Sequence, residues 1–371
     1  MANTVSDSQP LALLGQKDND VAMEQRPPSA PRATMLDVAK LAGVGLKTVS
    51  RVVNNEAGVS EATRQRVTRG VDQLNYRHNL AASNLRRSSG RTGMIGALIQ
   101  DVDNRFSSTL LRALEDRAHD HGASLITAFL DEDPERERSQ VMSLIGHRVD
   151  ALVLMPATQT QDYLMAERRA GLPMVFVDRV PHGIDVDSVT VDNLHGARMA
   201  VQHLLSHGHR RIAFVGDLPD IETANLRRQG YEMTMTEAGF PPTPDLIKMG
   251  NRRREAAETT VMELMATPEP PTALFAGSNV ISVGAIRALR TLRREREVAI
   301  VGFDDFPMAD LIDPPLTVIR QDIDAIGQRV VSLLWAQLDG ETAAPRRVVL
   351  PVELIRRGSG EIPGPHGTLL S

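Results

Sequence analysis

Side chains able to contact the base edges of a nucleic acid are concentrated in one short segment, residues 46–54, with the sequence LKTVSRVVN. If this segment is a helix, its three valines share one face and are buried. The residues left for the outer face are Leu46, Lys47, Thr48, Ser50, Arg51 and Asn54. Short polar groups and a bidentate donor are what base edges in a major groove require. The segment therefore predicts a helix that reads double-stranded DNA.

A preceding helix and a glycine bend must position this face. Thr34 can cap a helix over TMLDVAKLA, with Asp37 as its capping-box partner. We expect the apolar positions inside that helix to be Leu36, Val38, Ala39 and Leu41. Glycines at 43 and 45 break the helix and permit a tight turn. A third helix follows the cap residue Ser60, and its apolar face is formed by Val67, Val71 and Leu74.

Composition and charge limit the kind of protein. The chain has 371 residues, no cysteine and only 3% aromatic residues. The missing cysteines exclude disulfides and cysteine-based zinc fingers, and the few aromatics argue against a stacking platform for single strands. Residues 32–93 carry 11 basic and 4 acidic side chains, a balance of +7, so the rest must carry −12 of the total of −5. A basic segment on an acidic body is typical of a DNA-binding regulator.

The sequence gives no sign of membrane insertion or secretion. No apolar run approaches the ~20 residues that cross a bilayer, and the start lacks the basic segment of a secretory signal. We expect residues 1–31 to form a disordered leader, with translation beginning at Met1 or Met23. These features favour a cytoplasmic protein without membrane contact.

Several weaker patterns are interpreted as structural. His119 and His121, like His207 and His209, have no third ligand nearby in the sequence, so no metal site is expected. No glycine-rich phosphate loop is present, and no cofactor is expected. The acidic and basic run at 131–138 predicts the solvated start of a helix.

From Met94 onward, short apolar runs alternate with amphipathic segments of helical period. The predicted strands are 94–99, 124–130, 151–155, 174–178, 188–192, 211–216, 272–277 and 298–305. This alternation predicts parallel sheets covered by helices on both faces. The length of this part favours two similar lobes, with a ligand cleft between them at the carboxyl ends of the strands.

With these residues in view, the chain resembles the lactose-repressor (LacI/GalR) family of bacterial transcription regulators over about residues 34–357. In the first part the resemblance depends on DVAKLAGV, TVSRVVN, VSEATRQRV and LNYRHNLAASNLRR. In the body it depends on HGHRRIAFVG, GFDD and PPLTVIRQD. Each motif alone is a modest signal, but their order and spacing together are specific.

The resemblance implies the domain organisation and the fold class, which is α/β with an all-α start. The expected parts are a helix-turn-helix headpiece at 32–78, a hinge helix and linker at 79–91, a two-lobed core of parallel sheets like periplasmic binding proteins at 92–357, and a tail at 358–371. Lobe 1 is expected at 92–191 and 321–340, and lobe 2 at 192–319 and 345–357. The expected crossings between lobes lie near Asp192, Ile319–Gln321 and Gly340–Pro345.

The resemblance also implies how DNA is bound. A homodimer would place two recognition helices in successive major grooves of a near-palindromic operator. Lys47 and Arg51 would contact bases, with Leu46 packed on a base or sugar. Phosphates would be held by Thr34, Thr48, Ser50 and Asn54. Gly45 stands where relatives usually carry a serine, so a phosphate contact there would come from the backbone.

In the family the hinge helix enters the minor groove. The residues of this chain that would face the groove are Asn79, Ala82, Leu85 and Arg86. Leu85 would insert as a wedge between base pairs and kink the duplex. The alternative for Leu85 is plain packing between domains.

For the effector, the resemblance implies a polar site in the cleft. The residues carried over are Arg105, Phe106, Asp178, Arg179, Asn225, Asn251, Ser278, Asn279, Asp304 and Gln321. Asn225 falls where relatives usually have an arginine, and Ser278-Asn279 where they have an Asn-Asp pair. Such a site suits a neutral hydroxylated ligand, a sugar or a sugar derivative. The alternative is that Asp304 and Arg179 only tie strands together.

We therefore expect a DNA-binding repressor under the control of a small polar effector. The alternative class is a sugar-binding transport component or an α/β enzyme, which the body alone does not exclude. A transport component would carry an export signal and no basic headpiece, and an enzyme would show an acid–base or nucleophile constellation.

Overall fold

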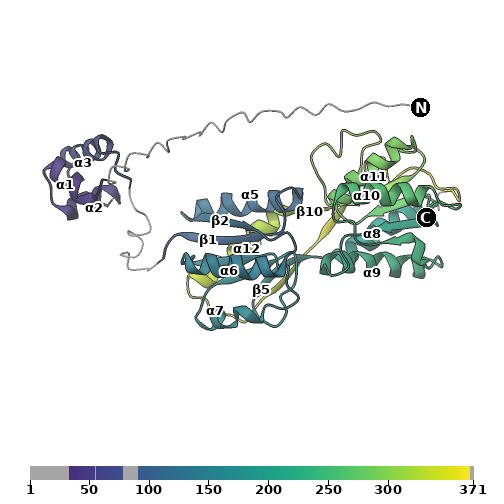
Figure 1. Cartoon of the computed structure of the whole chain (residues 1–371), viewed down its shortest axis with the longest axis horizontal. Helices are drawn as coiled ribbons and strands as arrows, with labels where there is room; N and C mark the ends of the chain where they lie inside the picture. Colours follow the sequence, from purple (N-terminus) through teal and green to yellow (C-terminus); the bar gives the residue numbers. More distant parts are fainter. Residues whose placement is uncertain (1–32, 55, 78–90, 368–371) are drawn as a thin grey trace, which may run out of the picture. The chain divides into compact units, whose positions relative to one another are not determined.

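The computed structural model describes residues 33–54, 56–77 and 91–367. The chain divides into two compact units, one within residues 1–80 and the other within residues 81–371. Figure 1 shows that the first unit is all-helical and that the second contains both helices and sheets. The predicted fold class is confirmed.

The described residues of the first unit, 33–54 and 56–77, form three helices: α1 (Met35–Ala42), α2 (Leu46–Val53) and α3 (Glu61–Gln73). Thr34 and Asp37 form the predicted capping box, in which the Thr34 backbone N–H donates to the Asp37 carboxylate at 2.9 Å. Gly43 ends α1 with a left-handed φ of 62°, which lets the chain turn directly into α2. The predicted helix-turn-helix is therefore confirmed.

The core of this unit leaves out two leucines of α1. Its buried apolar side chains are Val38, Ala39, Ala42, Val49 and Val67. Leu36 and Leu41 lie within α1 as predicted, but they are 53% and 51% exposed and do not belong to the core. At 3.6 residues per turn, the face that carries the buried residues of α1 points away from both leucines.

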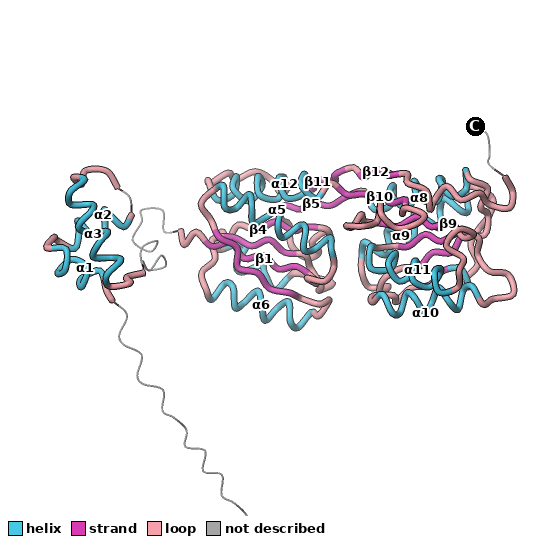
Figure 2. Tube along the Cα trace, turned by 90° about the horizontal axis from the view of Figure 1, so that it is seen from above, coloured by secondary structure: helices cyan, strands magenta, loops and turns pink. Residues whose placement is uncertain are grey.

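Lobe 1 of the second unit is built on a parallel sheet with the strand order β11-β5-β4-β3-β1-β2. Its strands are β1 (Met94–Ile99), β2 (Ser124–Phe129), β3 (Ala151–Leu154), β4 (Met174–Val177), β5 (Asp187–Val191) and β11 (Arg347–Leu350). One face is covered by α5 (Arg105–Asp120) and α12 (Ile323–Leu338). The other is covered by α6 (Pro134–Gly146), η1 (Asp162–Leu164) and α7 (Met165–Arg169). Figure 2 shows α5 and α12 on the side of the sheet opposite to α6.

Lobe 2 repeats this plan with the order β12-β10-β9-β8-β6-β7, in which only the β10–β12 pair is antiparallel. Its strands are β6 (Ile212–Val215), β7 (Ile247–Lys248), β8 (Ala273–Ala276), β9 (Ala299–Phe303), β10 (Thr317–Gln321) and β12 (Val352–Ile355). One face is covered by α8 (Asn193–Ser206) and α9 (Glu222–Glu237). The other is covered by α10 (Arg254–Met265) and α11 (Asn279–Thr291), and η2 (Pro244–Leu246) precedes β7.

Alternate residues of each strand face opposite helical layers, which explains the apolar runs in the sequence. In β8, Phe275 belongs to the core under α8 and α9, whereas Leu274 and Ala276 belong to the core under α10 and α11. All eight predicted strands are confirmed. Strands β7, β10, β11 and β12 are additional to the prediction.

The chain crosses between the lobes three times. The first crossing follows β5 at Asp192, and the second follows Gln321 at the end of β10, both as predicted. The third crossing lies at Pro351, and its predicted place at Gly340–Pro345 is wrong. The strand β11 still pairs with β5 in lobe 1, and only β12, after the proline, joins lobe 2.

The predicted C-terminal tail is part of lobe 2 as far as the structure describes it. The Ser359 hydroxyl donates to the Ile300 carbonyl at 2.7 Å and accepts from the Thr317 backbone N–H at 2.9 Å. The His209 ring lies 2.8 Å from the Ile362 carbonyl. These contacts hold the segment after β12 against the beginnings of β9 and β10 and the residue His209, which precedes β6.

Candidate functional site

The outer face of α2 carries the side chains that were predicted for DNA contact. Lys47 and Arg51 are exposed, and Leu46 is 46% exposed although it is apolar. Arg51 has an exposed glutamate, Glu56, 3.9 Å away, which is a weak ion pair in water. Arg51 can therefore turn toward DNA without breaking a strong contact.

Three shorter polar residues of α2 are half-buried: Thr48, Ser50 and Asn54. The Asn54 amide donates to the Ser50 hydroxyl at 3.3 Å. Gly45 begins α2 without a side-chain cap, so only backbone N–H groups are offered at this helix end. The predicted hinge residues Asn79, Ala82, Leu85 and Arg86 lie outside the described residues.

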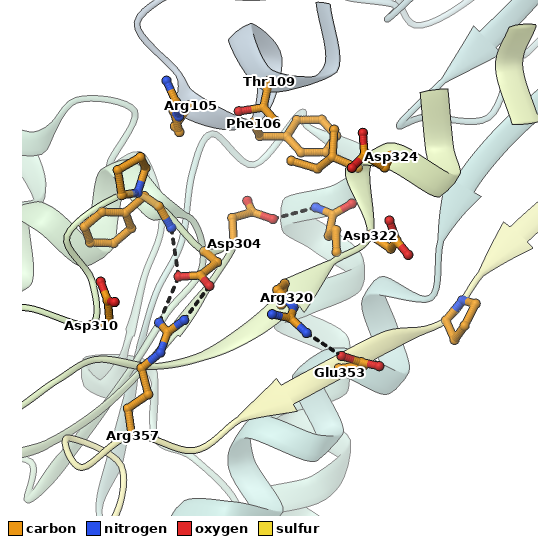
Figure 3. A pocket seen from close by; sticks show the side chains of 16 residues that line it. Arg105, Phe106, Thr109, Asp304, Asp310, Arg320, Asp322, Asp324, Glu353 and Arg357 are labelled. Atoms are coloured by element: carbon orange, nitrogen blue, oxygen red, sulfur yellow. Dashed lines mark hydrogen bonds and ion pairs between the residues drawn. The ribbon is translucent and has the colours of Figure 1, made fainter. Parts of the chain in front are cut away.

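Two cavities lie between the lobes of the second unit, and residues of both lobes line each of them. The small cavity has a volume of about 70 Å³ and the large cavity about 720 Å³. Phe106 and Asp304 line both, so they form a shared wall. Figure 3 shows the large cavity, with Phe106 and Thr109 contributed by α5 and Asp304 turned toward the second crossing.

The acidic residues of the small cavity follow the carboxyl ends of strands, as expected for a ligand site in parallel sheets. They are Asp101, Glu132, Asp178, Asp217 and Asp304. Glu132, Asp178 and Asp304 have left-handed φ values of 59°, 71° and 70°. Non-glycine residues hold such backbone conformations only where the surroundings impose them, and such residues cluster at functional sites.

Arg179 is held in the wall of the small cavity by lobe 1. Its side chain is 10% exposed and forms a bidentate pair with Glu132, with N···O distances of 2.6 and 2.5 Å. It also donates to the Pro156 carbonyl at 2.7 Å. Its Nε lies 3.6 Å from the Asp178 carboxylate, beyond hydrogen-bond distance.

Arg227 supplies the corresponding guanidinium from lobe 2. It donates to Asn193 Oδ1 at 2.8 Å and to the Gly277 carbonyl at 2.7 Å. It lies 3.6 Å from the Asp304 carboxylate, and its guanidinium carbon is 3.7 Å from the centre of the Phe303 ring. Arginine is suited to such a place because it combines planar stacking with several donors.

Burial sets the protonation of the carboxylates. It raises the pKa of Asp178 to about 6, despite the opposing charges of Arg179 and Arg227. Burial also raises the pKa of Asp217 and of Asp304. The charged forms of these carboxylates are therefore poorly hydrated, and hydroxyl donors from a ligand would stabilise them.

Polar contacts cross from one lobe to the other around the small cavity. The Asn279 amide donates to Asn104 Oδ1 at 3.0 Å, and Arg252 lies 3.4 Å from Glu132. At a second place the Val180 backbone N–H donates to Glu222 at 2.9 Å. The lobes are thus closed on each other, which explains the small volume. Ligand pockets usually measure roughly 300 Å³ or more, so side chains around the small cavity must move to admit a ligand.

Two buried polar atoms at the cavities have no hydrogen-bond partner within the described part of the chain. Arg179 Nε is a donor, and Gln321 Oε1 is an acceptor. The Gln321 amide nitrogen donates to Asp304 at 2.5 Å, which leaves its oxygen unused. Orphaned groups of this kind call for an explanation, and a hydroxyl fits both because it donates and accepts.

Seven of the ten predicted effector residues line the cavities. Asp178, Arg179 and Ser278 line the small one, Arg105 and Gln321 line the large one, and Asp304 lines both. Phe106, as noted, also lines both. Asn279 is buried and contacts Asn104 across the cleft.

Three predicted positions are not in the cavity walls: Asn279, described above, Asn225 and Asn251. The Asn225 amide turns to the Pro219 carbonyl. Asn251 is used within lobe 2, where it donates to the Lys248 carbonyl at 2.9 Å and accepts from Thr260 at 2.7 Å. The guanidinium is not replaced by an amide, since Arg227 supplies it two residues further along α9.

The sequence reasoning missed several wall residues. Arg227 could have been found because it lies on the buried face of α9 with Ala224 and Tyr231, at helical spacing. The run at 131–138 is not simply solvated. The side chain of Glu132 is 9% exposed, and the residue Glu137 is fully buried.

Comparisons with known proteins agree with this architecture. Bacterial regulatory proteins of the lacI family match at residues 34–79, and the periplasmic binding protein-like domain matches at residues 201–360. The chain is 32% identical over 330 residues to the ribose operon repressor of Escherichia coli (strain K12), covering 88% of this chain and 99% of that protein. It is 30% identical over 329 residues to the HTH-type transcriptional repressor CytR of the same strain, covering 88% and 96%.

Solved structures show the same similarity. The lac repressor dimer bound to operator and the anti-inducer ONPF has a TM-score of 0.77 at 27% identity, covering 88% of this chain and 99% of that one. The complex of the transcriptional regulator CelR with cellobiose has a TM-score of 0.65 at 31% identity, covering 88% and 100%. A helix-turn-helix unit followed by a two-lobed α/β unit defines a DNA-binding regulator with a ligand-binding core. The chain belongs to the LacI family of bacterial regulatory proteins, and it is a transcription regulator, not an enzyme.

Within residues 33–54, 56–77 and 91–367, no helix is both long and apolar enough to span a bilayer. The same stretches contain no group of His, Asp or Glu side chains arranged to hold a metal ion.

Proposed function

We propose that this regulator represses transcription by binding a near-palindromic operator as a homodimer, and that a small neutral sugar or sugar derivative in the interlobe cavities controls its affinity for DNA. Acting on DNA, it is expected in the cytoplasm. The observation that carries the proposal is the pairing of an exposed base-reading face on α2 with a buried, incompletely satisfied polar cavity in the core.

The DNA part is supported by the side chains of α2. Lys47 and Arg51 are exposed cations of α2 that can reach base edges, and Arg51 can bind guanine O6 and N7 together. Leu46 is exposed beside them and would pack on a base or sugar. Thr34, Thr48, Ser50 and Asn54 would hold phosphates. The hinge residues named above would complete the contact in the minor groove.

The effector part is supported by the chemistry of the cavity. Carboxylates beside guanidiniums can bind neighbouring hydroxyl groups, which donate to the first and accept from the second. Phe106 offers a ring face to the apolar side of a sugar ring. The ribose operon repressor and the CelR–cellobiose complex among the similar proteins point to the same ligand class.

Control of DNA binding would follow from movement of the lobes. Because the chain crosses between lobes at Asp192, Gln321 and Pro351, a ligand that changes their separation acts on all three connections. The coupling must be reciprocal, so operator DNA changes effector affinity by the same factor.

The test is a thermal-shift screen of neutral sugars on the full-length protein, followed by operator binding with each sugar that raises the melting temperature. We expect at least one sugar to stabilise the protein and to change operator affinity at least tenfold. Stabilisation without any change in DNA affinity would refute the regulatory role of the cavity.

A further inference from the structure

We propose that Glu132 is a built-in anion that makes the small cavity reject anionic ligands and select neutral ones. The inference rests on the proposed function, because it concerns which effector the same cavity admits. On this proposal, the Glu132 carboxylate allows the protein to distinguish a neutral sugar from the phosphorylated or acidic form of that sugar.

Glu132 occupies the position that a ligand anion would take. Its carboxylate meets Arg179 edge to edge at 2.6 and 2.5 Å, and Arg252 of lobe 2 lies 3.4 Å from the same carboxylate. A guanidinium binds a ligand carboxylate or phosphate in this same bidentate way. The two arginines that could hold an anion are therefore already neutralised from within the chain.

The surrounding loop holds Glu132 in place. The residue has a left-handed φ of 59°, directly after Asp131 at 54°. Its backbone N–H donates to the Gln100 side chain at 2.8 Å, and Gln100 in turn donates to the Met155 carbonyl at 2.7 Å. With its side chain 9% exposed, the carboxylate is a fixed part of the wall.

The charge balance of the cavity leads to the same conclusion. Five carboxylates and three guanidiniums line it, so an entering anion meets net negative charge in a poorly solvated space. Rejection by an unfavourable charge is an effective way to gain specificity. A neutral polyol meets no such barrier and still finds donors and acceptors.

The experiment uses inorganic phosphate as the probe on the full-length protein, at constant ionic strength. Wild type, Glu132→Ala and the control Glu135→Ala are compared by calorimetric titration and by melting temperature. Glu135 loses the same charge from an exposed position in the first turn of α6. We expect Glu132→Ala to bind phosphate at least tenfold more tightly than the other two, and Arg252→Gln in that background to reduce the gain.

Equal phosphate affinity in all three proteins, or a gain that is unaffected by Arg252→Gln, would overturn the proposal. Glu132→Gln keeps the side-chain volume and replaces the alanine variant if that variant does not fold. The binding of D-ribose and of ribose 5-phosphate to the same proteins is then compared. We expect only the Glu132 variants to gain affinity for ribose 5-phosphate. Absence of any sugar binding would count against the proposed function but leave the phosphate comparison decisive for Glu132.

Discussion

Asn279 of lobe 2 donates a 3.0 Å hydrogen bond to Asn104 of lobe 1. Asn104 caps α5 and Asn279 is the first residue of α11, so the N-terminal ends of two helices meet across the cleft. This contact joins the lobes beside the cavity that we assign to the effector.

We expect Asn279→Ala to weaken effector binding about three- to tenfold. The substitution removes a hydrogen bond of the closed arrangement, worth about 1 kcal/mol, and so favours the open lobes. Calorimetric titration with the sugar found in the screen measures the effect. Unchanged affinity would mean that the closed arrangement does not contribute to binding.

We expect Arg227→Met to lower the free energy of unfolding by about 3–5 kcal/mol, because Asp304 remains buried without its cationic partner. Urea unfolding measures this loss. Adding Asp304→Asn should recover much of the stability but not effector binding. If the double variant still responds to the sugar, the two residues act only as a tie between strands.

Asp178 should give the protein a pH-dependent stability. Its pKa is about 6 in the folded protein and 3.8 when unfolded, so the folded state binds its proton more tightly. The stability from this group is full below pH 4 and is lost as pH rises through 6, by up to about 3 kcal/mol. Asp178→Asn should remove this fall in the unfolding free energy, whereas the exposed control Asp220→Asn should keep it. An equal pH profile for wild type and Asp178→Asn contradicts this.

Much of the fold could be predicted because the signals are local. The capping box of Thr34 and Asp37 needs only its own neighbours, and strands such as β4 are apolar runs because both faces of the sheet are covered. The strands β11 and β12 could not be predicted, since each is short and a single proline, Pro351, separates them. Their places are decided by pairing with strands far away in the sequence.

The residues of the site also divide into those with a local sequence signal and those without one. Asp178 and Asp304 could be anticipated because each directly follows a buried strand, where ligand sites of parallel sheets lie. Aligning motifs misses Arg227, because a shift of two residues along α9 exchanges a half-buried side chain for a buried one. The sequence around Glu132 is typical of a solvated helix start, and no local signal indicates that Glu132 pairs with Arg179, 47 residues away.

We expect Arg51→Ala to weaken operator binding by roughly 1–3 kcal/mol while leaving the affinity for scrambled DNA nearly unchanged, because a base contact is lost. Fluorescence anisotropy with both duplexes measures the difference. The control Arg112→Ala removes an exposed charge from α5 and should alter neither affinity. Equal losses on both duplexes would assign Arg51 to phosphate contact.

The most direct test of the account is a selection of bound fragments from genomic DNA by the full-length protein, followed by titration with the stabilising sugar. We predict an inverted-repeat sequence bound roughly 10³-fold or more above competitor DNA, with an affinity that changes at least tenfold when the sugar is added. Recovery of no preferred fragment, with and without the sugar, would contradict the account.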